Sequence, residues 1–185
     1  MTEPEPDSNM SGPAMSGRYV VAFVESASAV SPVFQRKAED VLEEFGIEDP
    51  DPESFYDVEA FGDALREVEN RAGEQTVMKA GERMVDANDQ IVAQESARAG
   101  LEVMGEQHEA IHRNYTRAAA GGYEVEAVEP RRFRVGIYGD YPFPLSLPKG
   151  AVRGTVKVTE PEATMPDVSE VPAADEETAA LVVTW

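Results

Sequence analysis

Two histidines four residues apart, His108 and His112, are the side chains of this sequence best suited to metal chemistry. With Glu109 they match the pattern H-E-x-x-H, in which two histidines on one helical face bind zinc and the glutamate acts as a general base. Three fixed positions in a charged helix also arise by chance, and His108 falls on an apolar stripe where a hydrogen-bonded core histidine is common. We therefore predict no metal site. Zinc binding by His108 and His112, and a zinc hydrolase built on them, are the alternatives.

A group of arginines follows the histidines. Arg132 and Arg134 would point to one side of a strand, and Arg113 and Arg117 are four residues apart, as on one face of a helix. Converging guanidinium groups hold a carboxylate or phosphate through paired hydrogen bonds. However, the chain has 36 acidic and 16 basic residues, so a glutamate is within reach of almost every arginine. Internal salt bridges are the expectation, and anion binding is the alternative.

Three aromatic residues lie near a pair of prolines, Pro142 and Pro144. Their rings could line a groove for a planar or apolar molecule, or they could cap the core from a rigid turn. The candidate ligand-binding residues are Tyr138, Tyr141, Phe143, His112, Arg113, Arg132 and Arg134.

Hydrophobic periodicity and capping residues predict the elements that position these side chains. The predicted helices cover residues 31–45, 57–72, 74–88 and 91–119, with a short one near 149–150; either Ser54 or Asp57 can cap the second of them. The predicted strands cover residues 19–24, 123–127, 132–138, 154–158 and 180–185.

This order predicts an α+β fold, in which N-terminal helices pack on an antiparallel sheet formed mainly by the C-terminal half. Residues 1–17 are rich in Pro, Ser, Glu and Gly and are predicted to be a disordered tail. Residues 18–185 then form a single domain. If the closing strand lies at an edge of the sheet, it offers a route to a homodimer.

The composition narrows the class of protein. A net charge of −20, with only four lysines among the 16 basic residues, is typical of a protein adapted to a saline cytoplasm. The absence of cysteine excludes disulfides, thiolate metal sites and cysteine nucleophiles. We expect no membrane segment and no signal peptide, and no binding to nucleic acid, because phosphate contact needs a broad basic face. The expected location is the cytoplasm.

Three groups of residues, in order, resemble haem-nitric-oxide-binding-associated and vinyl-reductase-like ligand-binding domains. The first group is Gly73-Glu74-Gln75-Thr76 with Gly81. The second group begins with His112-Arg113-Asn114-Tyr115 and continues with Gly121-Gly122-Tyr123, Tyr141-Pro142-Phe143-Pro144, Gly150 and Gly154. The third group is the closing segment from Asp175 to Trp185. The sequence departs from the family pattern at Leu145, where the family has cysteine, at Asn114, where it has glycine, and in lacking the cysteines before the closing strand. A cysteine-dependent metal or redox role therefore does not carry over.

The resemblance implies an α+β fold, often dimeric, with a pocket for a small apolar or haem-like molecule. It does not imply catalysis, because such domains mostly sense or bind. Haem ligation by His108 or His112 is not expected, because the associated domain is distinct from the haem-carrying one. We therefore expect a non-catalytic small-molecule-binding or sensory domain that acts through a partner protein or through self-association. A structural or scaffolding interaction protein is the alternative.

Overall fold

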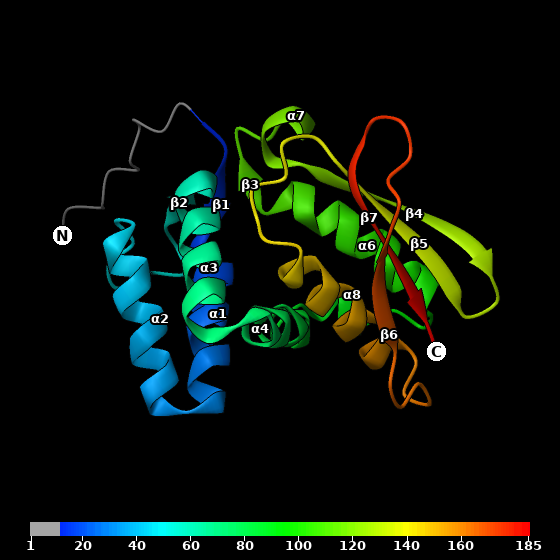
Figure 1. Ribbon diagram of the computed structural model, residues 1–185, viewed down its shortest axis with the longest axis horizontal. Coiled ribbons are helices and arrows are strands. Elements are labelled where there is room, and N and C mark those ends of the chain that lie inside the picture. Colours follow the sequence, from blue (N-terminus) through cyan, green and yellow to red (C-terminus); the bar gives the residue numbers. More distant parts are fainter. Residues whose placement is uncertain (1–11) are drawn as a thin grey trace.

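The computed structural model describes residues 12–185, and its elements fall into two groups (Figure 1). One group contains the first three helices and a small three-stranded sheet. The other contains a four-stranded antiparallel sheet and the two helices that pack on it. Helix α4 lies between the groups and packs against α1 and α8. None of the helices in the described part of the chain is long and apolar enough to span a bilayer.

The elements have the following bounds. The helices are α1 (Gly17–Val30), α2 (Pro32–Glu44), α3 (Val58–Ala72), α4 (Glu74–Asp86), α5 (Asp89–Val92), α6 (Ala97–Ala110), α7 (Arg117–Ala120) and α8 (Ser146–Thr159). The strands are β1 (Ala14–Ser16), β2 (Phe55–Asp57), β3 (His112–Arg113), β4 (Gly122–Glu129), β5 (Arg132–Tyr138), β6 (Asp167–Val171) and β7 (Glu177–Thr184).

The helices predicted over residues 31–45, 57–72 and 74–88 are confirmed as α2, α3 and α4. Helix α2 begins at Ser31, whose hydroxyl accepts a hydrogen bond from the Phe34 amide at 3.1 Å, and Pro32 occupies the first helical position. Helix α3 begins at Asp57, whose carboxylate accepts from the Ala60 amide at 2.9 Å. At these positions the capping residues and the hydrophobic periodicity agree, which is why the sequence alone predicted the starts of these helices.

The larger sheet has the strand order β4-β5-β7-β6, with every pair antiparallel. Apolar side chains of its inner face form one cluster with α6 and α8: Phe133, Val135, Ile137, Leu181 and Val183. The predicted α+β class is confirmed, and α6 and α8 are the helices that contact this sheet directly. Strand β7 lies between β5 and β6, so the closing strand is not the edge that a homodimer could use.

Helices α4 and α8 approach each other unusually closely because glycines face each other across their contact. A Cβ atom on Gly150 would lie 1.9 Å from the carbonyl oxygen of Met78, and one on Gly81 would lie 2.3 Å from that of Leu147. Any larger residue would push the helices apart. This contact sets the spacing of two of the helices that line the cavity described below.

Two predicted strands are wrong. Residues 19–24 belong to α1, where Val20, Phe23 and Ala27 are buried at helical spacing. A short β-branched run does not by itself distinguish a strand from a buried helix. Residues 154–158 belong to α8, in which Val152, Val156 and Thr159 are buried at helical spacing.

The long helix predicted over residues 91–119 is also wrong, because three helices and a strand share this region. Ser96 caps α6 by accepting from the Ala99 amide at 3.3 Å, and α6 ends before β3, which pairs with β1. The tail predicted over residues 1–17 contains β1, so its last residues are ordered. Residues 1–11 of that tail lie outside the described part of the chain.

Candidate ligand-binding site

A cavity of about 80 Å³ lies where the two groups of elements meet. Its walls come from β1, α1, α4, α5, α6, β4 and α8 and from the loop before α8. Most of the lining is apolar, with Met84, Ile91, Met104 and Phe143 among it. The cavity therefore favours an apolar ligand of a few heavy atoms.

The imidazole ring of His108 lines this cavity, and the residue is 7% exposed. Its Nε2 lies 2.9 Å from the carbonyl oxygen of Ala120, so Nε2 carries the hydrogen and donates it. Burial, followed by the charge of His112, lowers the pKa of His108 to about 4. The ring is therefore neutral at neutral pH. The rings of Tyr123 and Tyr141 lie 4.9 Å and 5.9 Å from it, centroid to centroid.

His112 lies beside His108 but outside the cavity lining, because it belongs to β3 rather than to α6. Its Nδ1 donates to the carbonyl oxygen of His108 at 2.5 Å, and the two rings lie 4.7 Å apart. Its Nε2 is buried without a hydrogen-bond partner among the described residues. Burial also lowers the pKa of His112. Both rings are thus neutral and held by backbone carbonyls.

The geometry gives little support to the alternative in which His108 and His112 bind zinc. Within residues 12–185, no cluster of three His, Cys, Asp or Glu side chains is arranged to hold a metal ion. Glu109, which would be the general base of a zinc hydrolase, is exposed, and its carboxylate lies 3.5 Å from the Tyr115 hydroxyl.

The polar side chains that line the cavity hydrogen-bond to one another or to the protein. The hydroxyl groups of Tyr123 and Tyr141 share a hydrogen bond, and burial raises the pKa of both well above the usual value. Elsewhere in the lining, Asn88 Nδ2 donates to the Tyr19 hydroxyl at 3.0 Å.

The predicted site residues separate into two groups. Tyr141 and Phe143 line the cavity, whereas Tyr138, Arg113, Arg132 and Arg134 do not. Sequence reasoning missed Tyr19, Asn88 and Tyr123 as lining residues. For Tyr123 a signal existed, since the alternation of its strand placed it on the same face as Val125 and Ala127.

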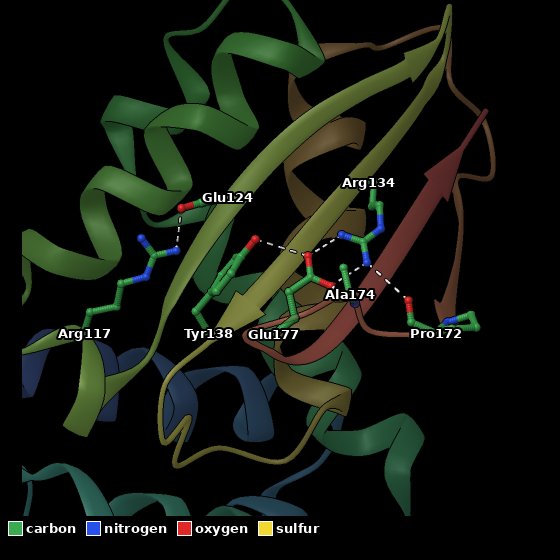
Figure 2. Close-up of polar contacts among 7 residues, drawn as sticks. All are labelled: Arg117, Glu124, Arg134, Tyr138, Pro172, Ala174 and Glu177. Atoms are coloured by element: carbon green, nitrogen blue, oxygen red, sulfur yellow. Dashed lines mark hydrogen bonds and ion pairs between the residues drawn. The ribbon is translucent and has the colours of Figure 1, made fainter.

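The arginines outside the cavity pair with glutamates or stack on aromatic rings. Figure 2 shows Arg134 against Glu177, whose side chain is 2% exposed. Glu177 also accepts from the Ala174 amide at 2.6 Å and from the Tyr138 hydroxyl at 3.3 Å. The Arg134 hydrogen bonds are the largest cause that lowers the pKa of Glu177 to about 2.

The remaining arginines follow the same pattern. Arg117 donates to Glu124 at 2.7 Å and lies over the Tyr138 ring, while Arg132 is 3.9 Å from Glu129. The guanidinium group of Arg113 lies 3.6 Å from the centre of the Phe55 ring. These contacts support the salt-bridge interpretation over an anion site.

Solved structures with the same fold are H-NOX domains, the haem-nitric-oxide-binding class. A mutant of the T. tengcongensis H-NOX superposes with a TM-score of 0.67 at 14% identity, covering 92% of this chain and 97% of that one. A structure described as probing haem distortion in the H-NOX family gives 0.67 at 14% identity, covering 92% and 95%. An oxygen-binding H-NOX domain related to soluble guanylate cyclases, in its oxygen complex, gives 0.63 at 14% identity, covering 92% and 94%.

No protein-family model matches the chain, and no curated protein matches it in sequence. The structural likeness spans almost the whole chain and nearly all of each neighbour. It confirms the haem-nitric-oxide-related fold that the sequence motifs implied. The chain has the H-NOX fold.

Proposed function

We propose that this protein is a non-catalytic sensory domain that binds a small apolar molecule directly in the cavity beside His108. The single observation that supports this most is the cavity itself, which lies at the junction of the helical and sheet groups and is lined almost entirely by apolar atoms. The H-NOX fold adds to it, since one neighbour is described as binding oxygen.

Haem, which the fold class implies, does not fit the residues present. The cavity holds about 80 Å³, whereas pockets for drug-sized ligands hold ~300–1,000 Å³. The Nε2 of His108 is engaged by the Ala120 carbonyl, and the rings of Tyr123 and Tyr141 fill the space beside the imidazole. No lysine or arginine lines this cavity in the described part of the chain to neutralise haem propionates. The protein shares the fold of the H-NOX domains, but we do not propose a haem site in it.

A ligand at this place changes the packing between the two groups of elements, because residues of both line the cavity. We infer that a partner protein or a second copy of the chain responds to that change. The setting is a salt-rich cytoplasm, for which the charge of −20 and the scarcity of lysine are the support.

Xenon tests the proposal, because it enters dry apolar cavities and forms no hydrogen bonds. Under xenon pressure, methyl NMR signals of Val85, Ile91 and Met104 should shift with saturation. Ala151→Leu adds three carbons to a lining residue of the cavity and should abolish the shifts. Ala60→Leu, on α3 and outside the lining, is the matched control and should behave as wild type. Unchanged methyl signals in the wild-type protein would leave the scaffolding alternative in place.

A further inference from the structure

A second hollow adjoins the cavity and differs from it in chemistry. Its volume is about 250 Å³, and polar and apolar groups share its lining. Four residues line both spaces: Tyr19, Met84, Asn88 and Gln107. We name the apolar cavity the inner chamber and this second hollow the outer chamber.

The hydrogen bond from Asn88 to Tyr19 lies at the boundary of the two chambers. Asn88 Oδ1 accepts from the amides of Gln90 and Ile91 at 3.1 Å and 3.2 Å, which caps α5. The cap fixes the orientation of the side-chain amide, because only the oxygen can accept. Nδ2 is thereby aimed at the Tyr19 hydroxyl, with Asn88 itself 8% exposed.

We propose that the two chambers form one site for a small, uncharged amphipathic molecule, with the Asn88–Tyr19 hydrogen bond as the partition that the ligand opens. This rests on the proposed function, since the apolar part of the ligand occupies the inner chamber. The polar head accepts the hydrogen bond from Asn88 Nδ2 in place of the Tyr19 hydroxyl.

The lining of the outer chamber determines the kind of head group. It contains one cation, Arg18, one anion, Asp89, and the amides of Asn88, Gln90 and Gln107. Opposite charges and amides favour a hydroxyl, carbonyl or amide head over an ion. The two volumes together reach the lower end of the ~300–1,000 Å³ range of ligand pockets.

The inner chamber limits the apolar part. A cavity of ~150 Å³ holds benzene, which is about 25 Å³ for each carbon. The inner chamber, at about 80 Å³, thus accommodates about three carbons. A primary alcohol such as 1-butanol places its remaining carbon and its hydroxyl at the partition.

Straight-chain primary alcohols test this on the full chain by NMR titration. Affinity should rise about fourfold for each methylene up to 1-butanol and then level off. In Tyr19→Phe, Asn88 Nδ2 has no protein partner, so 1-butanol should bind roughly two- to tenfold more tightly than to wild type. Tyr56→Phe, which removes a hydroxyl that accepts from the Asp51 amide and lines neither chamber, should bind as wild type does.

The outcomes separate this inference from the proposed function. If xenon binds but 1-butanol binds Tyr19→Phe no more tightly than wild type, the two-chamber inference fails and the inner site stands. If butyrate or butylammonium binds as tightly as 1-butanol, the uncharged head group is wrong. If xenon itself does not bind, the proposed function fails, and this inference fails with it.

Discussion

The ion pair between Arg134 and Glu177 makes the sharpest prediction about stability. Glu177→Gln keeps the shape of the side chain but removes the charge that Arg134 faces on the sheet surface (Figure 2). A hydrogen bond to a charged group contributes ~1.5–3 kcal/mol, and breaking a fully buried pair costs ~3–5 kcal/mol. Because the Arg134 side chain is 20% exposed, water compensates it in part, and we expect a loss of about 2 kcal/mol in the free energy of unfolding.

Urea denaturation at constant high salt measures this loss, and a thermal melt should show a fall of roughly 4–8 °C. Glu126→Gln removes an exposed charge directly opposite Arg134 on the neighbouring strand and, because that pair is solvated, should cost less than ~1 kcal/mol. The difference between wild type and Glu177→Gln also depends on pH. Since the pKa of Glu177 is lowered to about 2, its contribution is complete above about pH 4.5 and disappears as the pH falls towards 2. A Glu177→Gln protein as stable as the Glu126→Gln control at pH 7 would refute this argument.

Three further predictions concern the helix contact, the charge and the buried histidine. Gly150→Ala places a methyl group against the Met78 carbonyl and should cost more than about 3 kcal/mol by urea denaturation. Ala99→Gly, at a half-buried position in the first turn of α6, should cost at most about 1 kcal/mol, and equal losses would contradict the contact. Transfer from multimolar to low potassium chloride should lower the melting temperature, because carboxylate repulsion is no longer screened, and an unchanged melt would contradict salt adaptation. The NMR signals of the His108 ring should stay constant from pH 8 to about pH 5 and titrate near pH 4. Because this pKa lies below the usual ~6.5, His108 should contribute stability above pH 6.5 that is lost as the pH falls through 4. A titration midpoint near 6.5 would show instead that the ring is in water.

The sequence was most informative where local chemistry decides the structure. The caps at Ser31 and Asp57 and the alternation of residues 123–127 identified α2, α3 and β4. Helix α8 was missed in part because its glycines disfavour a helix locally, while contact with α4 requires them. Strand β6 was missed because its sequence, DVSEV, is mostly polar, as suits a strand at the edge of the sheet.

The candidate site was only partly visible for a similar reason. Tyr141 and Phe143 were predicted as ligand-binding residues, whereas His108 stood out only as a core histidine or an alternative zinc ligand. Tyr19 and Asn88 lie 69 positions apart in the sequence, and only tertiary packing brings them together. The arginines looked like a binding surface, but Arg117, Arg132 and Arg134 pair with glutamates and Arg113 stacks on Phe55. Sequence spacing could not assign Glu177, the partner of Arg134, because it lies 43 positions away.

A crystal structure of the wild-type protein under xenon pressure tests the central claim most directly. We expect a xenon peak in the inner chamber, in contact with Met104 and Phe143 and beside the His108 ring. We also expect that protein purified from its expression host carries no stoichiometric haem in that crystal. An inner chamber without xenon, or a porphyrin bound there through His108, would contradict it.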